Sequence, residues 1–137
     1  MIEKKHTTNY TNSFISVSPD SKARVGIEPE VAEKPSLARR IYELIAERPY
    51  ELTSDEVLIQ VQAAQQEKSI EEVQDAFYAK GQPCLRSSLL VKKYGWGIHF
   101  NEEQKIALVD CASESYRQFT SDPNIAHYAG MRSKRAQ

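Results

Sequence analysis

The spacing of hydrophobic and polar positions changes along the chain, and its clearest pattern lies in residues 84–111. Trp96, Ile98 and Phe100 share one face of an extended segment, while Gly97 and His99 share the other. Alternation with a period of two is typical of a half-buried strand. The polar residues 101–104 follow, and apolar positions resume at 106–109. The pattern therefore predicts an antiparallel hairpin.

Residues 85–92 show the same alternation in a weaker form, because Leu90 breaks it. We expect this segment to extend the hairpin as a further strand that bends off near Gly95. Glycines on both sides of Trp96 allow a positive φ, or the close approach of another backbone or a ligand.

Segments with a helical period precede the hairpin. Ser36 is a good N-cap for a helix that runs to about residue 48, where Pro49 ends it. Thr53 and Glu56 form the capping box of a second helix, which begins at residue 54 and fades near residue 64.

A third helix is predicted to begin at Ser69, which forms a capping box with Glu72, and to end at Gly81. Four of its apolar residues are expected to face inward: Ile70, Val73, Ala76 and Phe77. Ser113 caps a short helix after the hairpin, and Asp122 and Pro123 end it.

These elements predict one α+β domain over residues 1–137, with residues 1–9 and 130–137 flexible. Residues 10–17 form a strand that pairs with the hairpin, and residues 20–35 form a long surface loop. We expect an antiparallel sheet of three or four strands with helices packed on one face. A winged-helix-like arrangement is the alternative, because three helices precede a hairpin.

Composition limits the class of protein. The formal net charge is −1, which makes nucleic acid an unfavoured partner. No apolar run approaches the roughly 20 residues of a membrane span, and the first residues lack the apolar region of a signal peptide. We therefore expect a cytoplasmic protein without a membrane partner.

The residues with the most chemistry lie in and before the hairpin. The guanidinium of Arg86 could bind an anion, the Trp96 ring could stack on a ligand, and His99 is the best candidate for a general base. Each group also has a purely structural interpretation. Arg86 could lie on a solvated strand face, Trp96 could be a core residue, and His99 could be a surface imidazole without a function. The candidate ligand-binding residues are Arg86, Lys92, Tyr94, Trp96 and His99.

On a strand, Lys93 would point away from Arg86 and Lys92, which weakens the prediction of one basic patch. Cys84 is a weaker candidate for a nucleophile, assisted by His99 and Arg86. The chain has no CxxC pair, and its three histidines are scattered, so we expect reduced cysteines, no metal and no cofactor.

Four stretches carry a resemblance: residues 10–20 (YTNSFISVSPD), 49–58 (PYELTSDEVL), 80–100 (KGQPCLRSSLLVKKYGWGIHF) and 131–135 (MRSKR). Together they resemble a family of small uncharacterised bacterial and fungal proteins, a domain of unknown function in which YGWGIH is the most specific motif. The resemblance implies a stand-alone protein of one domain, and it implies no activity or site residue.

The sequence favours a non-catalytic binding or interaction module whose partner is a small molecule or a protein, and it leaves a homodimer open. A small enzyme with a site near Arg86 and His99 is the second hypothesis, and a winged-helix-like nucleic-acid binder is the third. Whether the protein is an enzyme stays undecided at this stage. The ligand, the oligomeric state and the role of residues 20–35 are not determined by the sequence.

Overall fold

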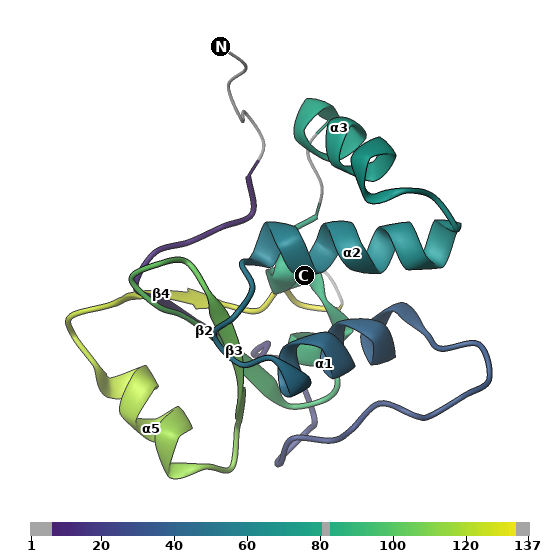
Figure 1. Ribbon diagram of the computed structural model, residues 1–137. Helices are drawn as coiled ribbons and strands as arrows, with labels where there is room; N and C mark the ends of the chain where they lie inside the picture. The colour runs from purple at the N-terminus through teal and green to yellow at the C-terminus, as the bar shows by residue number, and fades with distance from the viewer. Residues whose placement is uncertain (1–6, 81–82, 134–137) are drawn as a thin grey trace.

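A computed structural model describes residues 7–80 and 83–133 and shows a four-stranded sheet with helices on both faces (Figure 1). The strands are β1 (Ser13–Ser16), β2 (Trp96–Phe100), β3 (Ile106–Asp110) and β4 (Ala126–Ala129), in the order β3-β2-β1-β4. The helices are α1 (Leu37–Glu47), α2 (Ser54–Gln66), α3 (Ile70–Lys80), α4 (Leu89–Lys92) and α5 (Glu114–Ser121). The predicted α+β class and the hairpin of β2 and β3 are confirmed.

The sheet is mostly antiparallel, as expected, but its last strand is parallel. β1 pairs with β2, and β2 with β3, in antiparallel register, whereas β4 runs parallel to β1. The strand at 126–129 was not predicted from the sequence, since Ala126, His127 and Ala129 give it little apolar character. Three of its four residues are exposed, so pairing with β1 rather than burial makes it a strand.

Side chains alternate between the two faces of the sheet. Ile15, Ile98 and Phe100 point toward α1 and α2 and join the main apolar core. Phe14, one residue away from Ile15, packs instead against the rings of Tyr116 and Phe119 on α5. The prediction of helices on one face therefore holds for α1 to α4, while α5 covers the other face (Figure 1).

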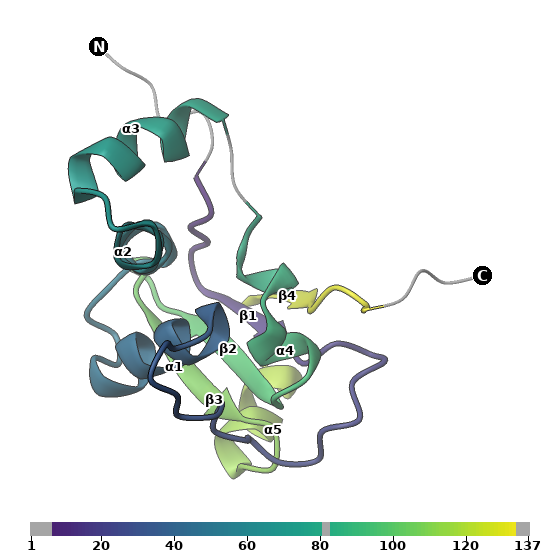
Figure 2. The ribbon, with the colours of Figure 1, turned by 90° about the vertical axis from the view of Figure 1, so that its right-hand side faces the viewer.

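The first three helices are stacked in the order α1, α2, α3 outward from the sheet (Figure 2). Their N-caps are the predicted serine and threonine residues Ser36, Thr53 and Ser69, and both capping boxes are present. On α3 only Val73 and Phe77 are buried, so the prediction that Ile70 faces inward was wrong, and so was that for Ala76. The predicted cap at Gly81 lies outside the described residues.

Residues 85–92 are helical rather than extended, so the strand predicted there is wrong. A 3-10 turn η1 (Leu85–Ser87) leads into α4, and the Ser88 hydroxyl accepts a hydrogen bond from the Leu90 N–H (3.1 Å). Leu90 and Val91 are both fully buried, which a strand exposing alternate residues could not achieve. The break in alternation at Leu90 was the signal of this conformation.

The long segment 20–35 has no helix or strand, but it is fastened at several points. The Gly26 N–H donates to Asp110 Oδ1 (2.8 Å), and the Ile27 N–H donates to the Tyr94 carbonyl (2.7 Å). Further along, the Arg39 guanidinium on α1 pairs with Glu28 (2.7 Å). The loop is thus a strap laid across the start of β2.

The flexibility predicted for the two ends falls mainly on residues outside the described parts of the chain. Within them, Thr7 and Thr8 are hydrogen-bonded to Asp55, and Ser133 to Asp20. The helices of the described residues are all too short or too polar to cross a membrane.

Candidate anion-binding site

The five candidate residues of the sequence do not form one site. Arg86 lies at the end of β4, where its Nε donates to the Ala129 carbonyl (2.8 Å) and its guanidinium lies 5.7 Å from the centre of the Tyr128 ring. These contacts join β4 to the helical segment 85–92.

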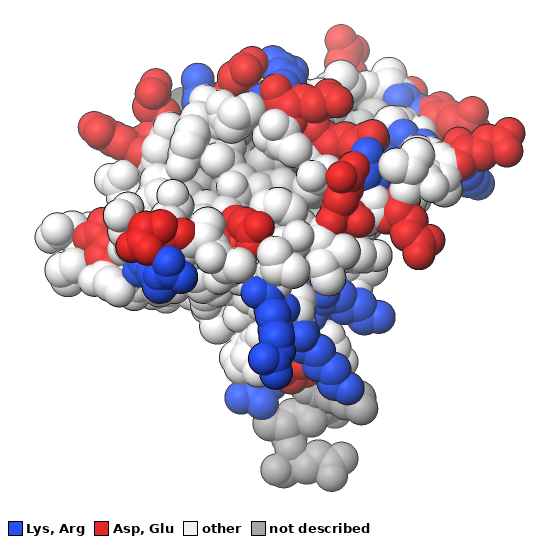
Figure 3. Space-filling view, turned by 90° about the horizontal axis from the view of Figure 1, so that it is seen from below, with Lys and Arg blue, Asp and Glu red and all other residues white. Residues whose placement is uncertain are grey.

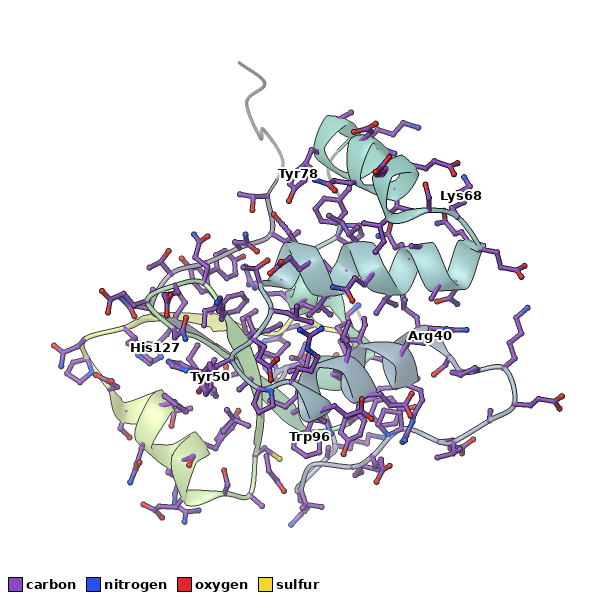
Figure 4. The ribbon with its side chains drawn as sticks, in the orientation of Figure 1. Arg40, Tyr50, Lys68, Tyr78, Trp96 and His127 are labelled. Carbon is purple, nitrogen blue, oxygen red and sulfur yellow. The ribbon has the colours of Figure 1, made fainter. Side chains whose placement is uncertain are left out.

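Tyr94 and Trp96 hold the strap. The Trp96 indole N–H donates to the Ile27 carbonyl (2.9 Å), and its ring packs against Tyr42 of α1 (5.6 Å between centroids). Gly26 passes so close beneath this ring that an added Cβ would lie 2.8 Å from it. A partly buried Trp96 thus uses both its N–H and its ring within the protein, and Figure 4 shows it beside the strap.

His99 lies on the opposite face, under α5. Its Nδ1 is 2.8 Å from the Tyr50 hydroxyl, and its ring stacks on Phe119 (4.1 Å between centroids). His99 pairs with Phe14 of β1, and Phe14 pairs with His127 of β4, so these three side chains share one face of the sheet.

Cys84 and Arg86 lie on the other side of the sheet from His99. The Cys84 sulfur is 3.9 Å from the Tyr10 hydroxyl, and Tyr10 stacks on Tyr128. Tyr128 pairs with Ile15, whose side chain belongs to the helix-covered face, whereas His99 pairs with Phe14 on the α5 face. A nucleophile formed by Cys84, His99 and Arg86 is therefore excluded by the topology. Cys84 and Cys111 are both free thiols.

Acid should lower the stability of the protein by protonating His99. Burial lowers the pKa of His99 below its ordinary value, although Asp122 acts in the opposite direction. Because the fold disfavours the imidazolium, the contribution of His99 to stability is full above a pH of about 6.5 and is lost as the pH falls below it. We expect His99→Gln, which keeps a hydrogen-bonding group near Tyr50, to have a smaller drop in melting temperature than the wild type between about pH 7.5 and 5.5. An equal drop in both proteins, measured by calorimetry, would show that His99 does not carry this dependence.

Among the five candidate ligand-binding residues, Lys92 lines a hollow in the surface. This lysine hollow has a volume of about 500 Å³. It is lined by Asp20, Lys22, Lys92, Lys93 and Ser133. Lys22 was not among the residues predicted from the sequence, and Lys93 was predicted to point away from Lys92 because a strand was expected there. The helical turn of α4 instead brings Lys92 and Lys93 to the same hollow.

Hydrogen bonds hold together the three segments of the lysine hollow, which are residues 18–22, α4 with Lys93, and Ser133. The Ser18 N–H donates to the Val91 carbonyl (2.9 Å), which joins the first segment to α4. The two oxygens of Asp20 accept from the Ser18 hydroxyl (2.7 Å) and the Ser133 N–H (3.0 Å), which joins the third. The frame of the hollow is thus built before any ligand arrives.

The lysine hollow is electropositive. Three lysines and one aspartate line it. The structure gives Lys22, Lys92 and Lys93 no ion pair with any residue in 7–80 or 83–133. Figure 3 shows Lys and Arg side chains gathered at this end of the molecule, with Asp and Glu spread over the rest of that face. Ammonium groups without a carboxylate partner are suited to bind an anion.

Nothing in the described part of the chain suggests a metal centre, since no group of three or more His, Cys, Asp and Glu residues there is arranged to hold an ion.

Comparison with known proteins identifies a family. The model of a family of unknown function (DUF6157) matches residues 5–136, nearly the whole chain. No curated protein and no solved structure matches the sequence.

Proposed function

The chain belongs to this family of unknown function, which brings no activity with it, and we propose from the lysine hollow that the protein binds a compact phosphate-bearing small molecule. The observation that carries the proposal is the convergence of Lys22, Lys92 and Lys93 on one hollow of about 500 Å³. This volume lies within the range of small-molecule sites. The methylene stems of the lysines offer apolar contact to the rest of such a ligand.

A small anion fits the lysine hollow better than nucleic acid does. A duplex carries a phosphate every few ångströms along each strand and is bound by rows of cations. Here three lysines line one hollow, and Asp and Glu are spread over the rest of that face (Figure 3). The net charge of −1 would also repel a long polyanion. A cytoplasmic location, where phosphorylated metabolites are abundant, is part of the proposal.

Titration with inorganic pyrophosphate tests the proposal. We expect Lys92→Gln/Lys93→Gln to weaken pyrophosphate binding by about tenfold, which corresponds to about 1.4 kcal/mol, because two charge-assisted contacts are lost. The matched control is Lys68→Gln/Lys80→Gln, which removes the same charge at α3 and at the link before it. Figure 4 shows Lys68 far from the sheet. Calorimetric titration should give the control the affinity of the wild type.

Salt gives a second criterion: pyrophosphate binding should weaken as the ionic strength rises, because an interaction between exposed charges is screened by salt.

Absence of pyrophosphate binding at about 5 mM, where even a millimolar Kd would be seen, would overturn the proposal. Equal binding by both double variants would do the same. Binding of duplex DNA that only the Lys92→Gln/Lys93→Gln variant loses, without pyrophosphate binding, would favour a nucleic-acid partner instead.

A further inference from the structure

A second cavity lies at the other end of the molecule, between α2, α3 and the chain that precedes β1. Its volume is about 460 Å³. Four amide side chains line it: Asn9, Gln60, Gln74 and Gln104. We call this cavity the amide pocket. None of the residues that line it is a lysine or an arginine, which distinguishes it from the lysine hollow.

Two helices present one stripe each to the amide pocket. Ile70, Gln74 and Tyr78 follow one another at intervals of four residues and so lie along one side of α3. Glu56 and Gln60 have the same spacing on α2. In Figure 4 the Tyr78 side chain extends from α3 toward the beginning of α2. The pocket is therefore a groove between two helices, with apolar contact supplied by Ile59 and Ile70.

Two of the amides are held in place by the protein. The Asp55 N–H donates to Asn9 Oδ1 (2.9 Å), which leaves the Asn9 NH₂ group to act as a donor. The Gln104 NH₂ group donates to the Thr11 hydroxyl (3.0 Å), which leaves its carbonyl oxygen to act as an acceptor. A fixed donor and a fixed acceptor thus face one cavity.

The other two amides are unengaged. Within residues 7–80 and 83–133, Gln60 and Gln74 have no hydrogen-bond partner, so both ends of each amide can bond to a ligand. The acidic groups nearby are Glu56 in the lining and the buried Asp55 behind it, and both would repel an anion.

From these groups we infer that the amide pocket binds an uncharged small molecule rich in both donors and acceptors, of the size of a nucleoside or a sugar. Amide side chains recognise such ligands because each offers a donor and an acceptor side by side. The site is independent of the lysine hollow.

The test is an NMR titration of the full chain with adenosine and, separately, with glucose, each to about 10 mM, enough to detect a millimolar Kd. We expect at least one probe to shift the side-chain amide signals of Gln60 and Gln74. The double substitution Gln60→Leu/Gln74→Leu should weaken the binding of that probe by about fivefold, as expected for lost hydrogen bonds. The control Gln65→Leu/Gln118→Leu changes two exposed glutamines elsewhere and should bind normally.

The two probes distinguish the sources of the ligand. A response to adenosine alone indicates a nucleoside site, and a response to glucose alone indicates a sugar site. No shift with either probe overturns the inference, as does binding that the Gln60→Leu/Gln74→Leu variant retains. Adenosine monophosphate binding more tightly than adenosine would also overturn it, because the carboxylates should oppose the added charge.

Discussion

Replacing Asp55 by alanine is expected to lower the free energy of unfolding by about 3 kcal/mol, because it leaves buried donors without an acceptor. The Asp55 side chain is 1% exposed. It accepts from the Thr8 N–H and hydroxyl (both 2.7 Å), from the Thr7 hydroxyl (2.7 Å) and from the Tyr78 hydroxyl (3.2 Å). One carboxyl group thus ties the N-terminal segment and α3 to the start of α2, where a negative charge also suits the helix dipole.

Chemical denaturation of Asp55→Ala, beside Asp75→Ala as an exposed control on α3, measures this effect. The control should lie within about 0.5 kcal/mol of the wild type. A loss below about 1 kcal/mol in Asp55→Ala would contradict the role assigned to the network.

The phenol of Tyr78 provides an independent readout of Asp55. Burial, together with the charge and hydrogen bond of Asp55, raises the pKa of Tyr78 to about 12. Removing the carboxyl group should therefore move the ultraviolet titration of this phenol to lower pH. Tyr78 also stabilises the fold below its ordinary pKa of about 10, and this contribution is lost as the pH rises toward 12.

Replacing Gly95 by alanine is expected to lower the free energy of unfolding by about 3 kcal/mol, as for Asp55→Ala but for a different reason. Gly95 has a φ of +75°, and a Cβ at this position would lie 2.4 Å from the Val25 carbonyl oxygen. The obstacle is backbone of the strap, which the Ile27 N–H and Trp96 hold in place. Alanine must therefore displace the strap as well as adopt a left-handed conformation.

Gly95→Asn separates the two causes. Asparagine tolerates a left-handed φ but carries the same Cβ, so equal destabilisation of both variants would identify the contact with Val25 as the cause. A much smaller loss of stability in Gly95→Asn than in Gly95→Ala would identify backbone strain as the cause. Denaturation monitored by Trp96 fluorescence suits both variants, because Trp96 is the only tryptophan and it touches the strap. An alanine variant as stable as the wild type would contradict the close approach.

Much of the architecture follows from short-range signals. The capping boxes at Thr53 and Ser69 place two helix starts correctly, because the groups that form them lie three residues apart. The alternation at 96–100 predicts the hairpin, and the glycines around Trp96 predict a positive φ or a close contact. Both of the latter occur at Gly95.

The candidate sites depend on contacts that sequence patterns do not contain. Lys92 and Lys93 diverge on a strand and converge on a helical turn, and only the burial of Leu90 and Val91 decides between these conformations. Lys22 lies near them because the hydrogen bond from the Ser18 N–H to the Val91 carbonyl ties its segment to α4. The amide pocket likewise combines residues from four distant segments.

By itself, the sequence determined the α+β class, the starts of α1, α2, α3 and α5, and the hairpin, because periodicity and capping act between near neighbours. Tertiary structure alone decided the parallel pairing of β4, the split of the predicted site over two faces of the sheet, and the lysine hollow. Asp20 and Ser133, for example, meet across 113 residues of chain, and no local preference encodes a hydrogen bond over that separation.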